Sequence, residues 1–174
     1  AMSRRQRQMC IRDRFRHGKS DWNASYGSDH ERPLSKRGVH AAMRMGRFIA
    51  EKNQIPDLVI SSTALRAQST AKLAINSANW DSKIVLEGGI YGGSPDYLLN
   101  LIHAQSDSNN VLCLVGHEPN FSNFISKATH EDYINFTTAN MAKINFTAKR
   151  WTEVQFGTGS LEWHQQPKKL ESLV

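Results

Sequence analysis

Apolar positions along this chain follow two periods, and segments of the two kinds alternate. Short apolar or alternating runs are typical of β-strands, whereas apolar residues spaced three or four apart are typical of amphipathic helices. The predicted strands cover about residues 9–16, 57–61, 83–86, 111–115, 141–146 and 159–164. The predicted helices begin near Ser35, Ala64, Ser94 and Pro119, and they end near Gln54, Asn76, Ile102 and Ala128.

Strands that alternate with helices predict an α/β fold. We expect a three-layer sandwich in which helices cover both faces of a mainly parallel central sheet. The last two predicted strands form a pair that we expect to be antiparallel to part of this sheet. The 174-residue chain shows no internal repeat and no linker, so we predict a single domain over residues 15–166, with a charged tail at 167–174.

Residues 1–14 do not fit this pattern. A parallel strand in the middle of a sheet is buried on both faces and should be continuously apolar, but Arg12-Asp13-Arg14 is not. Residues 4–13 resemble the translation of a transposon-type sequencing adapter. We therefore expect residues 1–14 to be a non-native start, with a cloning remnant at Ala1-Met2, that forms part of the first strand.

The charge distribution argues against nucleic-acid binding. The net charge is +6, but residues 1–14 contribute five arginines and one aspartate to it. A basic arm without aromatic residues or a folded motif is a weak sign of nucleic-acid binding. The composition, 39% hydrophobic and 22% charged, is typical of a soluble globular protein, and no apolar run is long enough for a membrane span.

The cysteines and histidines indicate the compartment and the absence of a metal. Cys10 and Cys113 are the two cysteines, and Cys113 lies in an apolar strand pattern, so we predict a buried free thiol and a reducing, cytoplasmic compartment. The seven histidines show no spacing typical of a metal site. We therefore expect neither a metal nor another cofactor.

Three predicted strands are followed by cationic or imidazole side chains. Arg16-His17-Gly18 ends the first, Arg66 follows the strand at 57–61, and His117 follows the strand at 111–115. In open α/β sheets, ligands bind beyond the carboxyl ends of the strands. The sequence therefore predicts an anion pocket built around His17.

These side chains are suited to phosphoryl transfer. A neutral imidazole such as that of His17 can attack phosphorus and form a phosphoramidate that water hydrolyses in a second step. Arg16 and Arg66 offer planar forks that match phosphate oxygens, and a protonated His117 can donate to a further oxygen. Ser20 is a further candidate phosphate ligand. Because this chemistry depends mainly on positioning and charge stabilisation, it needs no metal.

The motifs resemble those of the histidine phosphatase superfamily. The resemblance is carried by Arg16-His17-Gly18, by the segments 32–38 and 61–70, and by Gly116-His117-Glu118-Pro119. The short length, the Arg-Pro-Leu-Ser segment at 32–35 and the segment 136–139 make the chain similar to SixA-type phosphohistidine phosphatases. The resemblance covers roughly residues 15–165.

This resemblance implies a fold and residue roles. The fold would be like that of phosphoglycerate mutase. His17 would be the nucleophile that accepts phosphate, Arg16 and Arg66 would bind the phosphate, and His117 would complete the pocket.

One departure from the family pattern bears on the substrate. Larger members that resemble phosphoglycerate mutases carry a Glu-x-x-Tyr-Gly-Gly pattern, whereas here Gly88 stands where that glutamate would be. Glu87 is one position away and is the candidate acid. A general acid matters most for poor leaving groups such as alkoxides, and a protonated imidazole leaves without one. The pattern therefore favours phosphohistidine on a protein as the substrate.

Other functions remain open at this point. The protein could be a broader small-molecule phosphomonoesterase or a mutase with Glu87 as its acid. It could also be a non-catalytic module that binds phosphorylated partners. In the favoured interpretation it acts in signal transduction, and its partner is a phosphorylated protein or a small phosphorylated substrate. We expect a monomer that binds neither nucleic acid nor membrane.

Overall fold

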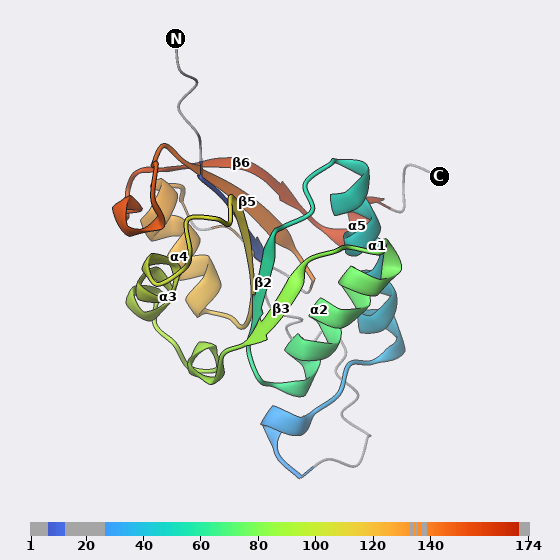
Figure 1. Cartoon of the computed structure of the whole chain (residues 1–174). Coiled ribbons are helices and arrows are strands. Elements are labelled where there is room, and N and C mark those ends of the chain that lie inside the picture. Colours follow the sequence, from blue (N-terminus) through green and yellow to red (C-terminus); the bar gives the residue numbers. More distant parts are fainter. Residues whose placement is uncertain (1–6, 13–26, 133, 135, 137–138, 171–174) are drawn as a thin grey trace.

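A six-stranded sheet forms the centre of the molecule (Figure 1). The computed structural model describes residues 7–12, 27–132, 134, 136 and 139–170. The strands lie in the order β3-β2-β4-β1-β5-β6. Their bounds are Arg7–Arg12 (β1), Leu58–Ser61 (β2), Lys83–Leu86 (β3), Val111–Val115 (β4), Met141–Phe146 (β5) and Gly159–Gln165 (β6). Neighbouring strands from β3 to β1 are parallel, whereas β5 is antiparallel to β1 and β6.

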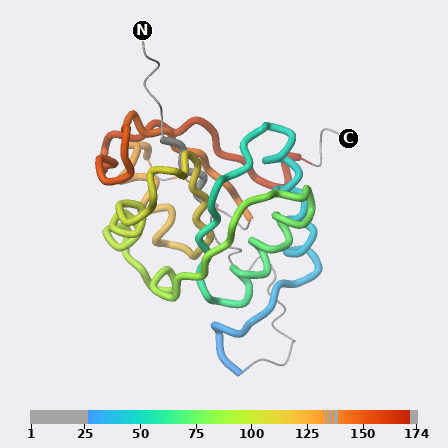
Figure 2. Tube along the Cα trace, in the orientation of Figure 1, coloured from blue at the N-terminus to red at the C-terminus, as the bar shows by residue number. Residues whose placement is uncertain are grey.

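Helices cover both faces of this sheet, which confirms the predicted three-layer α/β architecture. They are α1 (Lys36–Glu51), α2 (Leu65–Ser77), α3 (Pro95–His103), α4 (Asn120–Thr129) and α5 (Pro167–Leu170), and the 3₁₀ turns are η1 (Asp29–Glu31), η2 (Gly88–Ile90) and η3 (Trp151–Glu153). In Figures 1 and 2, α3 and α4 lie on one side of the sheet, and α1, α2 and α5 lie on the other. No helix among the described residues combines the length and the apolar character that a membrane span requires.

Alternate residues of the central strands separate the core into two layers. Ile60 and Leu114 pack into a cluster with the buried residues of α3 and α4. Val59, Cys113 and Val115 point the other way, into a cluster with Ala67 and other residues of α1 and α2. Because both faces of β2 and β4 are covered, their sequences are continuously apolar rather than alternating. Cys113 is buried, as predicted.

Local sequence signals position the helices. Ser35 Oγ accepts a hydrogen bond from Gly38 N at 3.2 Å, and Ser94 Oγ accepts one from Tyr97 N at 3.1 Å, so both serines are N-caps. Gly46 lets α1 approach α2 closely, since a Cβ at this position would lie 2.3 Å from the carbonyl oxygen of Ala74. This contact holds the C-terminal end of α2 against α1.

The first strand differs from the prediction of residues 9–16. It spans Arg7–Arg12 and lies between β4 and β5, with Arg12 level with Val115 and Met141. Residues 13–16 of the predicted strand lie outside the described residues. Backbone pairing with a neighbour on each side thus forms a central strand from residues of the segment 1–14.

Two other segments are more ordered than their sequences indicate. The glycine-rich segment around Ile90 is typical of an irregular loop, but it forms η2 and Ile90 is buried. The charged tail predicted at 167–174 begins with ordered structure, since residues 167–170 form α5 and Pro167 is buried. Conversely, the apolar Leu65 at the start of α2 is 41% exposed.

Candidate functional site

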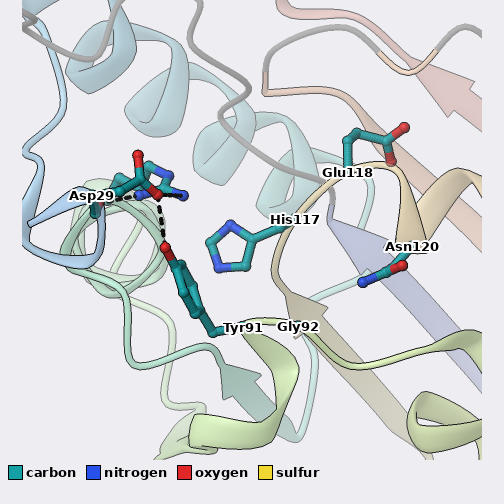
Figure 3. A pocket seen from close by; sticks show the side chains of 7 residues that line it. Asp29, Tyr91, Gly92, His117, Glu118 and Asn120 are labelled. Carbon is teal, nitrogen blue, oxygen red and sulfur yellow. Dashed lines mark hydrogen bonds and ion pairs between the residues drawn. The ribbon is translucent and has the colours of Figure 1, made fainter.

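A pocket of about 280 Å³ opens where the loops after β2, β3 and β4 meet η1 (Figure 3). Its lining residues are Asp29, Arg66, Tyr91, Gly92, His117, Glu118 and Asn120. The pocket lies beyond the carboxyl ends of parallel strands, where α/β proteins bind ligands. Two of the predicted site residues, Arg66 and His117, line this pocket.

Arg66 is a buried cation on the first turn of α2. Only 3% of the residue is exposed. Its Nη1 donates to the backbone oxygen of Asp29 at 2.7 Å, and its Nη2 donates to Asp29 Oδ2 at 3.1 Å. Its Nε is buried and has no hydrogen-bond partner among the described residues. The guanidinium is thus held at one edge while a donor on another edge remains available to a ligand.

Asp29 connects Arg66 to two further side chains. Asp29 Oδ1 accepts from Arg32 Nε at 3.1 Å and from Arg32 Nη2 at 2.5 Å, and Oδ2 also accepts from the Tyr91 hydroxyl at 2.8 Å. Figure 3 shows the Tyr91 hydroxyl directed toward the Asp29 carboxylate. Burial acts to raise the pKa of Asp29, but the hydrogen bonds from Tyr91 and Arg32 and the nearby Arg66 charge hold that pKa far below its usual value. Asp29 is therefore ionised at neutral pH.

The Tyr91 ring packs against the Arg66 guanidinium. The Arg66 guanidinium carbon lies 5.9 Å from the centre of the Tyr91 ring, and Tyr91 meets the His117 ring edge-to-face at 5.3 Å. Donation to Asp29 raises the pKa of the Tyr91 hydroxyl, and burial adds to the effect. Tyr91 therefore remains a neutral donor that packs between a cation and an imidazole.

His117 follows β4 and is 7% exposed. Its Nε2 lies 2.8 Å from Ser62 Oγ, and the Ser62 N–H donates to the carbonyl oxygen of Val115 at 2.8 Å. The hydroxyl of Ser62 also accepts from Ala64 N at 3.2 Å. Because Ser62 is anchored to the end of β4 and to the start of α2, its bond to His117 orients the imidazole relative to both elements.

Two further residues at the start of α4 line the pocket, as Figure 3 shows. Glu118 Oε1 accepts from Ser122 N at 2.9 Å, and Glu118 Oε2 accepts from the Ser122 hydroxyl. Both carboxylate oxygens of Glu118 therefore accept hydrogen bonds from Ser122, in the first turn of α4. Asn120, the first residue of α4, presents a polar amide to the same pocket.

The remaining predicted site residues have other positions. Arg16, His17 and Ser20 lie outside the described residues. Glu87 does not line the pocket, since its Oε1 accepts from the Tyr97 hydroxyl at 2.9 Å and from Gly89 N at 3.5 Å. In the part of the chain that the structure describes, no group of three or more histidines, cysteines and carboxylates could hold a metal ion.

Sequence reasoning missed Asp29, Tyr91 and Asn120 as lining residues. Asp29 resembles an ordinary turn former in a polar loop. A signal was nonetheless present, because Asp29 and Arg32 are oppositely charged residues three positions apart next to the Arg-Pro-Leu-Ser segment. The contact of Asp29 with Arg66 spans 37 residues of sequence and has no local signature.

Known proteins are similar to this chain in sequence. A family model of the histidine phosphatase superfamily (branch 1) matches residues 15–89. An uncharacterised chloroplastic protein of Arabidopsis thaliana is 27% identical over 170 residues, which cover 92% of this chain and 75% of that protein.

Solved structures share the fold. A structure assigned as the phosphohistidine phosphatase SixA of Nakamurella multipartitia matches with a TM-score of 0.80 and 21% identity, covering 93% of this chain and 96% of that one. A structure of the protein histidine phosphatase SixA complexed with tungstate matches with a TM-score of 0.77 and 19% identity, covering 94% and 99%. Over residues 15–89 this chain is therefore similar to the histidine phosphatase superfamily, and its fold is that of the SixA structures.

Proposed function

We propose that this protein is a metal-independent phosphatase that removes phosphate from phosphohistidine on a protein, through a phosphorylated His17. The observation that carries the proposal is that Arg66 is a buried cation with one donor left unpaired among the described residues. A buried guanidinium lines the pocket beside His117, and its buried Nε–H has no partner among the described residues. Such a donor is costly to bury unless a ligand pairs with it, and a phosphate oxygen is suited to do so.

The charge around Arg66 also favours an oxyanion. Arg66 and Arg32 both donate to the Asp29 carboxylate, and the Nε–H of Arg66 remains a positively polarised donor in the pocket. A second anion would therefore be attracted to it. Tungstate is an oxyanion like phosphate, and its presence in a SixA of the same fold is consistent with this proposal.

The proposed reaction has two steps. An imidazole nitrogen of His17 attacks phosphorus, and the bond from phosphorus to the substrate nitrogen breaks. The substrate imidazole, already protonated from solvent on its other ring nitrogen, leaves as neutral imidazole. Water then attacks the phospho-His17 and releases inorganic phosphate. Arg16, Arg66 and Ser20 are proposed to bind the phosphate oxygens, with His117, oriented by Ser62, donating to another.

The carboxylates near the pocket support a leaving group that needs no general acid. Asp29 is ionised by its partners, Glu118 is engaged by Ser122, and Glu87 is bound to Tyr97 outside the lining. Among the described residues, these carboxylates are therefore occupied in structural contacts. An imidazole leaves more readily than an alkoxide under such conditions, which favours phosphohistidine over a sugar phosphate.

The test compares the full-length protein with His17→Ala on two kinds of substrate. We expect kcat/KM on a phosphohistidine protein to exceed that on every member of a panel of alkyl phosphomonoesters. We also expect His17→Ala to abolish turnover, and a covalent adduct on His17 to be stable to base and labile to acid. Faster turnover of phosphomonoesters would favour a broader phosphomonoesterase, with Glu87 as its acid. Phosphate binding without turnover or labelling would favour a non-catalytic module.

The proposal extends to the cellular setting. A cysteine buried in the core, Cys113, suits a reducing compartment, so we propose a cytoplasmic enzyme that acts in signal transduction on a phosphorylated protein. We further propose that the enzyme is a monomer, which light scattering at several concentrations would test. A mass that rises toward twice that of the chain would contradict it.

A further inference from the structure

Asp29 contacts more of the pocket than a turn residue needs to. Its backbone oxygen and its carboxylate together accept hydrogen bonds from Arg66, Arg32 and Tyr91. These donors come from α2, from the residue that follows η1 and from the residue that follows η2. One residue thus joins three segments around the candidate phosphate site, through contacts that span up to 62 positions in sequence.

The contact with Arg66 leaves one edge of the guanidinium available. A guanidinium has five N–H donors, arranged along three edges. Asp29 accepts one hydrogen bond from Nη1 and one from Nη2, so it occupies the outer edge. The Nε–H belongs to another edge, and it is the donor that has no partner among the described residues. A phosphate oxygen can therefore bind at Nε while Asp29 stays in place.

We propose that Asp29 is a positioning residue, which holds the Arg66 guanidinium so that its Nε edge receives the phosphate oxygen. This inference rests on the proposed function. It differs from an opposite role, in which the Asp29 carboxylate occupies the phosphate position and competes with the substrate.

The anchoring of Asp29 favours positioning over competition. One of its two contacts to Arg66 comes from the backbone oxygen, which cannot leave unless η1 moves. Its Oδ1 is held by both Nε and Nη2 of Arg32, a residue that is fully buried. The carboxylate is therefore fixed at one end by a buried fork and at the other by Arg66 and Tyr91, rather than free to move aside for a ligand.

The experiment measures the binding of inorganic phosphate to the full chain by calorimetry, which requires no turnover. We expect Asp29→Asn to weaken phosphate binding at least about tenfold, the loss typical when the partner of a binding group is removed. Tyr91→Phe removes one donor to Asp29 and should weaken binding less, in the same direction. Asp96→Asn is the matched control, because the Asp96 side chain is 72% exposed and its ion pair with Lys127 is long, at 3.9 Å. Its phosphate affinity should equal that of wild type.

The direction of the change decides between the roles. Tighter phosphate binding by Asp29→Asn would show a competitor and overturn the inference, and unchanged binding would show a merely structural contact and overturn it as well. With substrate, positioning predicts that Asp29→Asn raises KM for the phosphorylated substrate as well as lowering kcat. If Asp29→Asn does not fold, as judged by thermal unfolding, the phosphate affinity of Tyr91→Phe decides instead. Weaker binding supports the positioning role, and tighter or unchanged binding contradicts it. Wild type that binds no phosphate would instead refute the proposed function itself.

Discussion

Two buried cations, Arg66 and Lys143, occupy opposite kinds of environment. Arg66 is 3% exposed and Lys143 is 2% exposed, so burial alone does not distinguish them. Lys143 on β5 forms an ion pair with Glu162 on β6, with 2.8 Å between Lys143 Nζ and Glu162 Oε2, so one positive charge meets one negative charge. Arg66 shares the carboxylate of Asp29 with Arg32 and lines a pocket.

The difference shows what marks a binding site. A buried charge is tolerated when it is paired and hydrogen-bonded, as Lys143 is, and such a pair says little about function. A buried guanidinium that lines a pocket and keeps a donor without a partner among the described residues is a feature that an anion would complete. The contrast separates the candidate phosphate ligand from a structural ion pair, and each prediction below tests one side of it.

The largest effect is expected from Arg66→Ala. Loss of one preorganised donor to the transferring phosphoryl group should cost about 2–4 kcal/mol of transition-state stabilisation, measured as the fall in kcat/KM on a phosphohistidine protein. Lys143→Met is the matched control, since it removes an equally buried cation of similar size. Its kcat/KM should stay that of wild type, and an equal loss in both variants would abolish the distinction.

Glu162→Gln should lower stability rather than activity. The change leaves the buried ammonium of Lys143 without its counter-charge, which costs about 2 kcal/mol, less than for a fully buried pair because the Glu162 side chain is 37% exposed. The midpoint of urea unfolding measures the loss. An unchanged midpoint would show that Lys143 is compensated by something other than Glu162.

Ser62→Ala should reduce kcat by about fivefold, with little change in KM. The substitution removes the hydroxyl that orients His117, and one such hydrogen bond contributes about 1 kcal/mol. Ser61→Ala is the control, because the Ser61 hydroxyl is equally buried but donates to the backbone oxygen of Ser62 instead of contacting His117. Equal rates for wild type and Ser62→Ala would mean that His117 is oriented by other contacts.

The smallest expected effect is on the pH dependence of stability that arises from the ion pair of Lys143 and Glu162. Burial acts to raise the pKa of Glu162, but hydrogen bonds from Lys143 and Asn145 outweigh it and lower that pKa in the folded state. A carboxyl with a depressed folded pKa stabilises the protein above its unfolded pKa, and this stability is lost as pH falls through the folded pKa. Wild type should therefore lose more stability than Glu162→Gln between about pH 6 and pH 3, by less than about 1 kcal/mol for this partly exposed group. Parallel unfolding curves against pH would contradict the prediction.

The order of helices and strands could be predicted from the sequence because each depends on local patterns. Continuous apolar runs mark β2 and β4, and serine caps mark the starts of α1 and α3. Side chains directly after the parallel strands gather at one edge of a sheet, so Arg66 and His117 could be brought together before any coordinates were known.

Tertiary structure alone decided how the pocket is held. The contacts of Asp29 with Arg66 and Tyr91 join residues 37 and 62 positions apart, and no local period encodes such pairs. The orientation of Glu87 toward Tyr97, which takes it out of the pocket lining, depends on how η2 packs against α3. Chain-local patterns thus determined which chemical groups this protein has and at which edge of the sheet they lie. Which of them touch, and which donor stays available for a ligand, depends on side-chain geometry that arises only when distant segments pack together.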